Sequence, residues 1–515
     1  MGFLNNITPR EYQEEIFKTC VEKNCLVVLP TGLGKTLIAL MLTIERMKKF
    51  PGEKVLFLAP TKPLAEQHLR YFKKNLPELF GEMQLFTGSV NAENRKKIWQ
   101  TADIIFSTPQ CVANDLKKRM YNLNDVCLLI EDEAHRCIKN YDYKYIAQEY
   151  RQQATHPRIM GLTASPGSEK SKIKDICKNL SIEEVELRTR ESSGVKEHVQ
   201  ELEIEKRMLD FPFEFEEMRH ILLKLFGDYV SELRERKVLF GPASKTDLIM
   251  LQKKISSNLM MNNHNFNYMQ GASACAQAIK IQHALELLET QTLAGFYKYL
   301  KGLFEQAARK QSKGVIKLVA KPEFNFVFSQ ANELLVKNKE HPKVQELIDI
   351  IIQEKKYNPN MKMIVFTQFR ETASNISKKI NEIEGIKSKI FIGQAKKDGE
   401  SLNQKQQKKI IEEFSEGKIN VLCATCIAEE GLDIPEVNIV VFYEPIPSAI
   451  RTIQRAGRTA RLMKGKLIML ITKKTRDETF FYVAKSREKK MKTAIESIKE
   501  DLGKEYKNEM QKKLE

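Results

Sequence analysis

The sequence lacks the long apolar runs that membrane proteins and secreted precursors carry. It contains no run of about eighteen apolar residues, and its N-terminus has no apolar core of the kind that a signal peptide needs. Hydrophobic residues still make up 42% of the chain, which is enough to form buried cores. These observations exclude a membrane channel or transporter and predict a globular protein of the cytoplasm.

The cysteines lack the spacing of a structural framework. Nine are present. Cys423 and Cys426 have the spacing of a redox or zinc motif, but no second Cys pair or His pair lies near them in the sequence. We therefore expect reduced, mostly buried thiols, with neither disulfides nor a structural metal.

Acidic residues are too few to balance the basic ones. The chain has 84 Lys and Arg against 67 Asp and Glu, which gives a formal net charge of +17. Such an excess suits a polyanionic partner such as nucleic acid, although many lysine-rich proteins bind none. The 515 residues are enough for about three domains.

A glycine-containing loop between an apolar strand and a helical pattern is the strongest local signal. It reads Leu29-Pro-Thr-Gly-Leu-Gly-Lys-Thr36, with Leu29 where the full pattern has glycine. In such loops backbone N–H groups surround a phosphate, the lysine reaches the outer phosphates, and the Thr hydroxyl ligates Mg²⁺. The helix that follows favours the same anion. We therefore predict a nucleoside triphosphate site at Thr31, Gly32, Gly34, Lys35 and Thr36, with Thr36 as a Mg²⁺ ligand.

A second acidic motif follows a predicted strand further along the chain. The stretch Ile130-Glu-Asp-Glu-Ala-His135 could be a surface turn, but the phosphate loop lies upstream in the same predicted sheet. We predict that Asp132 holds Mg²⁺ and that Glu133 orients and deprotonates the attacking water.

Short apolar strands alternate with helical patterns in two parts of the chain. Over about residues 1–168 the predicted strands are 25–29, 55–59, 103–107, 127–131 and 158–162. From about residue 341 they are 363–367, 388–392, 421–425, 439–443 and 467–471. This alternation indicates two parallel sheets covered by helices on both faces, with ligands at the carboxyl ends of the strands.

Between these parts the apolar residues recur at helical spacing throughout. Ser231 to Glu340 carries 16 Lys and Arg against 9 Asp and Glu, a net of +7. That excess is consistent with a phosphate-contacting face, although solvated helices often look similar. We therefore predict an α/β protein with two parallel-sheet domains, 1–199 and 336–485, and an all-helical domain inserted at 200–335. Residues 486–515 are interpreted as a charged, solvated terminal helix.

Four ordered motifs resemble those of superfamily 2 helicases of the DEAH-box kind: Pro30–Thr36, Asp132–His135, Thr163–Ser165 and Gln454–Arg461. Further stretches are similar to archaeal Hef and eukaryotic FANCM helicases, namely residues 391–394, 402–404, 429–435 and 442–450. The resemblance implies two RecA-like domains with a helical insertion. It also implies an ATP-driven translocase that acts on forked or branched DNA in the repair of replication forks.

The resemblance implies roles for further residues around ATP. Arg10 and Gln13 match the motif that reads adenine. Gln454, Arg458 and Arg461 match the motif that contacts the γ-phosphate from the second domain, with the two arginines as fingers. The residues implied to link ATP to the second domain are Gly431 and Asp433.

The resemblance also implies which residues couple hydrolysis to movement and which follow the strand. Thr163 and Ser165 would couple hydrolysis to movement. The small residues implied to contact strand phosphates without reading bases are Thr61, Gly88, Thr108, Thr367 and Thr425.

Partners and alternatives follow from the same resemblance. It implies DNA that is forked, branched or single-stranded, together with a nuclease module or repair proteins, and association with the nucleoid if the source is archaeal. The nuclease signature of full-length Hef is not matched, so we expect a helicase without a nuclease. An RNA-dependent ATPase of the RIG-I-like or Dicer type is the alternative. A non-catalytic clamp would need a broken Lys35, Glu133 or Arg458, and all three are intact.

Overall fold

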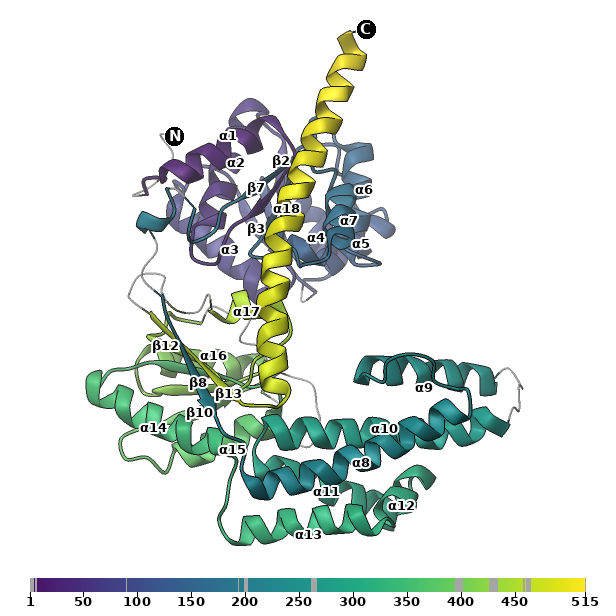
Figure 1. Cartoon of the computed structure of the whole chain (residues 1–515). Coiled ribbons are helices and arrows are strands. Elements are labelled where there is room, and N and C mark those ends of the chain that lie inside the picture. The colour runs from purple at the N-terminus through teal and green to yellow at the C-terminus, as the bar shows by residue number, and fades with distance from the viewer. Residues whose placement is uncertain are drawn as a thin grey trace.

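A computed structural model describes residues 4, 7–88, 90–192, 194–198, 202–260, 266–393, 402–425, 434–456, 459 and 465–514. Figure 1 shows two α/β domains stacked one above the other, with a bundle of helices projecting from the lower one. A long C-terminal helix, α18, runs alongside both α/β domains. The predicted fold class is therefore confirmed.

The first domain is built on a parallel sheet in the order β3-β4-β2-β5-β6-β1-β7. Its strands are β1 (Cys25–Val28), β2 (Lys54–Leu58), β3 (Met83–Phe86), β4 (Ile104–Ser107), β5 (Val126–Asp132), β6 (Ile159–Thr163) and β7 (Glu184–Leu187). Its helices are α1 (Glu11–Glu22), α2 (Lys35–Lys49), α3 (Lys62–Asn75), α4 (Ala92–Thr101), α5 (Pro109–Lys117), η1 (Ala134–Arg136), α6 (Asp142–Gln153), α7 (Lys170–Leu180) and η2 (Lys196–His198). The five predicted strands of this domain all form.

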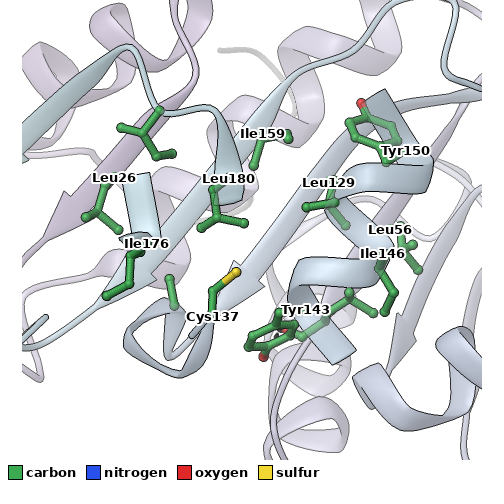
Figure 2. Close-up of a cluster of buried hydrophobic side chains, with 14 of the residues drawn as sticks. Leu26, Leu56, Leu129, Cys137, Tyr143, Ile146, Tyr150, Ile159, Ile176 and Leu180 are labelled. Carbon is green, nitrogen blue, oxygen red and sulfur yellow. Dashed lines mark hydrogen bonds between the residues drawn. The ribbon is translucent and has the colours of Figure 1, made fainter. Parts of the chain in front are cut away.

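Alternating side chains of the central strands fill two separate cores. Leu26 points into a cluster with helices α5 to α7, whereas Val27 points into a cluster with α1 to α3. Figure 2 shows the first cluster, in which Tyr150 of α6 lies near Leu129 of β5 and Tyr143 lies toward Ile146 of the same helix. Successive residues of a strand face opposite sides, so a strand buried on both faces is apolar throughout. That property explains why these strands could be predicted from apolar runs.

The second domain is a parallel sheet in the order β10-β11-β9-β12-β13-β8. Its strands are β8 (Leu202–Leu209), β9 (Met363–Phe366), β10 (Ser388–Phe391), β11 (Val421–Ala424), β12 (Ile439–Phe442) and β13 (Gly465–Thr472). Its helices are α14 (Pro342–Tyr357), α15 (Arg370–Ile380), α16 (Gln404–Ser415) and α17 (Ala449–Ala456), followed by α18 (Arg476–Leu514). The five strands predicted for this part of the chain are confirmed.

Strand β8 is a difference from the sequence analysis, which placed residues 200–212 in the helical insertion. It pairs with β13 along its whole length and forms one edge of the second sheet. All eight of its residues are half-buried or exposed, and charged residues such as Glu203 and Lys206 interrupt the apolar ones. Charged residues commonly protect an edge strand from pairing with other chains. Because they interrupt the apolar residues here, the strand could not be predicted from an apolar run.

The helical insertion consists of α8 (Phe213–Glu235), α9 (Lys245–Met260), α10 (Phe266–Thr290), α11 (Leu293–Ala308), α12 (Lys313–Val319) and α13 (Pro322–Val336). Its core contains the apolar residues that recur at helical spacing in the sequence, including Leu222, Leu285 and Leu300. The prediction of an all-helical segment is therefore confirmed from Phe213 to Val336.

Buried polar contacts attach this insertion to the second domain. Lys343 of α14 is fully buried, donates to the Thr290 carbonyl at 3.1 Å and forms an ion pair with Asp477. Arg476 at the start of α18 donates to the Gln282 side chain at 2.7 Å. A hydrogen bond from a charged group, such as those to Thr290 and Gln282, contributes about 1.5–3 kcal/mol. We infer that the insertion moves together with the second domain.

Helix α18 corrects the interpretation of residues 486–515 as a solvated helix. Met491, Ala494, Ile495 and Ile498 are buried in the core of the first domain, beside α7 and β7. Asp501 adds ion pairs to two lysines of α7. These apolar residues recur every three or four positions, which is the spacing of a buried helix face. The Lys and Glu residues between them made the segment resemble a fully solvated helix.

Two further expectations, on the cysteines and on membrane-spanning segments, can be compared with the described residues. All eight cysteines within them are buried and free of disulfides, and Cys426 lies outside them. Among the described residues no group of three metal-ligating side chains gathers. None of the described helices combines the length and the apolarity that a membrane-spanning segment needs.

Candidate nucleotide site and nucleic-acid interface

The phosphate loop lies between β1 and α2, as predicted. Gly32 and Gly34 have φ of 87° and 83°, a left-handed conformation that glycine adopts without steric cost. A Cβ atom at Gly34 would collide with the Gln13 side chain. Two constraints, backbone conformation and space, therefore require glycine at position 34.

Helix α1 holds this loop through a tyrosine and a glutamine. Tyr12 Oη donates to the Leu33 carbonyl at 2.9 Å, and Gln13 Nε2 donates to the same carbonyl at 3.0 Å. Gln13 Oε1 in turn accepts from the Arg10 backbone N–H at 2.9 Å. Of the two residues implied to read adenine, Gln13 thus contacts the predicted phosphate loop, and Arg10 lies next to Gln13.

Lys35 is the first residue of α2 and follows the two glycines of the loop. Its Nζ donates to the Leu29 carbonyl at 2.8 Å, so the residue that departs from the glycine pattern contributes its backbone oxygen. The ammonium group is also close enough to help lower the pKa of Asp132. The structure therefore brings the two predicted halves of the nucleotide site together.

Asp132 ends β5 and is almost completely buried. Its Oδ2 lies 2.8 Å from His68 Nε2, and its main-chain carbonyl accepts a hydrogen bond from Tyr143 Oη at 2.6 Å. Burial alone would raise the pKa of Asp132, but His68 and Lys35 outweigh this effect, so the pKa lies below its ordinary value. The carboxylate is therefore ionised at neutral pH.

Glu133 follows in a left-handed backbone conformation, with φ of 52°. Its carboxylate lies 3.2 Å from His135 Nδ1, and the same nitrogen lies 3.2 Å from Thr163 Oγ1. Thr163 Oγ1 in turn accepts from the Ser165 backbone N–H at 3.1 Å. This continuous chain joins the acidic motif to the residues implied to couple hydrolysis to movement.

The chain of contacts continues into the C-terminal helix. Ser165 Oγ donates to the Met491 sulfur of α18 at 2.9 Å, and both side chains are buried. Since α18 begins in the second domain, the motif implied to couple hydrolysis to movement touches an element that connects the two domains.

The second domain contributes Gln454, which is buried on α17. The residues that lie outside the described part of the chain are Arg458, Arg461, Gly431 and Asp433.

Arg455 was not predicted from the sequence. It is fully buried, with its guanidinium 5.0 Å from the centre of the Phe366 ring. Burial raises the pKa of the nearby Glu444 to about 7, although Arg455 opposes the rise.

The residues implied to contact a nucleic-acid strand all lie at or just beyond the carboxyl ends of strands. Thr61 and Thr108 occupy the N-cap positions of α3 and α5 without a side-chain capping hydrogen bond, and Gly88 is exposed in the turn after β3. Among the described atoms the buried Thr61 hydroxyl has no hydrogen-bond partner. Thr367 and Thr425 follow β9 and β11 and have buried side chains, the Thr367 hydroxyl donating to Phe369 O at 3.1 Å.

The donor set fits a small divalent cation. Asp132 supplies an ionised carboxylate and Thr36 a hydroxyl in the first turn of α2. Mg²⁺ is usually bound through one or two carboxylates plus substrate phosphates, with several waters retained, and does not need a cage of protein ligands.

Four residues around the site were not predicted from the sequence: Tyr12, His68, Tyr143 and Arg455. Each is buried and acts on a residue that was predicted or lies beside it. Tyr12 stands within the Arg10–Gln13 motif and could have been selected for that reason. His68 and Tyr143 stand in helical patterns where a buried polar group cannot be distinguished from a core residue.

Comparisons with known proteins agree with this geometry. The DEAD/DEAH box helicase family matches residues 10–173, and the helicase conserved C-terminal domain matches residues 342–463. A helical-bundle family described for ATP-dependent RNA helicases matches residues 214–341. The three matches correspond to the first domain, the second domain and the insertion.

Individual relatives cover most of the chain. A Methanocaldococcus jannaschii protein named as an ATP-dependent RNA helicase is 35% identical over 95% of this chain and 61% of its own length. The Fanconi anemia group M protein homolog of Mus musculus is 30% identical over 95% of this chain and 26% of its own length. The crystal structure of the Pyrococcus furiosus Hef helicase domain is 42% identical, with a TM-score of 0.70, over 92% of this chain and 98% of that one.

The chain spans only part of the curated relatives, between 26% and 61% of their lengths in the matches from mouse, fungi, fly and archaeon. It spans nearly all of the solved Hef helicase domain. The chain therefore belongs to the Hef and FANCM family of superfamily 2 ATP-dependent helicases and corresponds to the helicase portion of that family.

Proposed function

We propose that this chain is an ATP-dependent translocase that acts on forked or branched DNA. The observation that carries the proposal is the division of the site. Lys35, Asp132 and Glu133 come from the first domain, and the motif that contains Gln454 comes from the second. A nucleotide bound at their interface would favour closure of the two domains, and its hydrolysis would favour opening.

Each group has a distinct task in this proposal. Glu133 orients and deprotonates the attacking water, and Lys35 neutralises charge on the outer phosphates. Arg458 and Arg461 stabilise the charge that develops on the γ-phosphate. Thr36 and Asp132 would hold Mg²⁺, which when bound would neutralise charge on the phosphates. The contacts from Glu133 through His135 to Thr163 and Ser165 would transmit the state of the site.

RNA is the second candidate substrate. The helical-bundle family and the Methanocaldococcus relative both carry names that refer to RNA helicases. The fungal relatives, including those of Neurospora crassa and Schizosaccharomyces pombe, are named as ATP-dependent DNA helicases. A solved structure that matches 92% of this chain is the Hef helicase domain of Pyrococcus furiosus. We therefore favour DNA and propose a soluble, nucleic-acid-associated protein that works with a nuclease module or repair proteins.

The helical insertion is our candidate for the part that senses a branch. Backbone contacts at strand ends cannot distinguish a fork from a plain strand, so another surface is needed. The insertion carries an excess of basic residues and is attached to the second domain by buried polar contacts. Contacts with the second arm of a fork would therefore move with the domain that closes on ATP.

Deleting the insertion would uncover the buried Lys343–Asp477 pair. Replacing exposed lysines tests the assignment while that pair stays covered. Lys253 and Lys254 of α9 are exposed, as are Lys313 and Lys317 of α12. We expect one of the double variants, K253Q/K254Q or K313Q/K317Q, to lose the preference for forked over linear duplex DNA. Each lost phosphate contact should also reduce the slope of log affinity against log salt by roughly one.

The control for these variants is K356Q/K378Q, which removes two exposed charges from the second domain itself. Single-strand-stimulated ATPase should persist in all three proteins, and fork preference should persist in the control. Unchanged fork preference and salt slope in both insertion variants would show that these helices only brace the motor domains.

A further inference from the structure

A buried histidine on α3 contacts the carboxylate that the proposed function assigns to Mg²⁺. His68 and Asp132 are 7% and 6% exposed, and their side chains meet at 2.8 Å. The two residues are 64 positions apart in the sequence and belong to different elements, α3 and β5. The contact is therefore a product of the tertiary fold.

The surroundings of His68 fix the direction of its ring. The His68 ring packs on Phe57 of β2, with the ring centroids 4.4 Å apart. Phe57 in turn packs edge-on against Phe72, which lies on α3 like His68. A side chain enclosed in this way has few alternative rotamers. Its Nε2 is thus held toward Asp132.

Asp132 is fixed from its other end by a second buried residue. Tyr143 of α6 donates its hydroxyl to the Asp132 carbonyl, which fixes the backbone at the end of β5. His68 occupies one side of the carboxylate at Oδ2, and a carboxylate has about four lone-pair sites. Lone pairs therefore remain for a metal ion or its bound water while the carboxylate is held in one orientation.

Helix α3 connects this contact to the proposed strand-binding edge. The helix begins directly after Thr61, whose buried hydroxyl has no partner among the described atoms. His68 follows seven residues later, which corresponds to about 10 Å along a helix with a rise of 1.5 Å per residue. A strand phosphate that shifts the start of α3 would therefore shift His68 as well.

We propose that His68 is a positioning residue that orients Asp132 for the nucleotide-bound Mg²⁺ and couples this metal site to strand binding through α3. The inference rests on the proposed function, because it takes Asp132 as a metal ligand. Removing hydrogen-bond partners of metal ligands typically costs about 10–100-fold in metal affinity or activity. Coupling of this kind is reciprocal, so bound strand should also tighten metal binding.

The test uses two substitutions that separate the hydrogen bond from packing. Leucine in H68L keeps an apolar contact with Phe57 but cannot donate, whereas glutamine in H68Q can place its Nε2 near the imidazole Nε2. H220L removes an exposed histidine of α8 and is the control. The measurement is the affinity of Mn²⁺ for the full chain with a non-hydrolysable ATP analogue, by electron paramagnetic resonance, with and without a single-stranded oligonucleotide.

We expect H68L to bind Mn²⁺ about 10–100-fold more weakly and to lose the tightening by oligonucleotide. H68Q should stay within a few-fold of the wild type and retain the tightening, and H220L should be unchanged. H68M replaces H68L if the latter does not fold. Folded H68L or H68M with wild-type Mn²⁺ affinity and tightening would overturn the role of His68 alone. A wild-type protein that binds neither the analogue nor Mn²⁺ would overturn the proposed function as well.

Discussion

Replacing Arg458 or Arg461 with alanine should lower ATP turnover by about 10³–10⁵-fold, the range that arginine fingers supply in other phosphoryl-transfer systems. Both arginines follow α17, which ends at Ala456 in the second domain. The phosphate loop lies in the first domain, more than 400 positions earlier in the sequence. An effect of this size would require the two domains to share one reaction centre.

The measurement is kcat at saturating ATP and saturating single-stranded DNA. The control is R309A, which removes an exposed arginine at the end of α11 in the insertion. ATP binding should weaken much less than turnover, since the fingers act on charge that develops in the transition state. If both ATP affinity and turnover stayed at wild-type values, the nucleotide site would not lie between the domains.

The Lys35→Ala substitution should lower ATP turnover by roughly a hundredfold or more, the cost of removing one preorganised charge from a transition state. Lys35 lies at the phosphate loop, held by the Leu29 carbonyl and acting on Asp132. The groups implied to hold DNA lie at other strand ends. DNA affinity should therefore remain within a few-fold of the wild type.

A matched control for this substitution is K49A. Lys49 is exposed at the opposite end of the same helix α2, so its removal changes the net charge equally without touching the loop. Turnover is measured by phosphate release and DNA affinity by fluorescence anisotropy. Near-normal turnover in K35A would refute the assignment of the phosphate loop.

The elements that sequence patterns predicted are those whose burial leaves a simple signature. Central strands such as β1 and β5 are buried on both faces and therefore read as apolar runs. The three strands that were missed, β3, β7 and β8, are all edge strands. An edge strand has fewer buried positions and more polar residues, so its sequence resembles a loop or a helix surface.

The same reasoning applies to the candidate site. Gly34, Lys35 and Asp132 belong to compact motifs whose spacing reflects the chemistry directly, and the structure places them together. His68 could not be predicted because its partner is 64 residues away. The docking of α18 on the first domain was also missed, since only the three-dimensional packing shows which face of a charged helix is buried.

According to the proposed function, ATP hydrolysis by this chain responds to forked DNA. The most direct measurement is the ATPase rate of the wild-type chain with single-stranded DNA, forked DNA or RNA, at equal nucleotide concentration and fixed salt. We expect strong stimulation by DNA, greatest with the fork, and weak stimulation by RNA. Greater stimulation by RNA than by either DNA, or hydrolysis that is indifferent to all three, would contradict it.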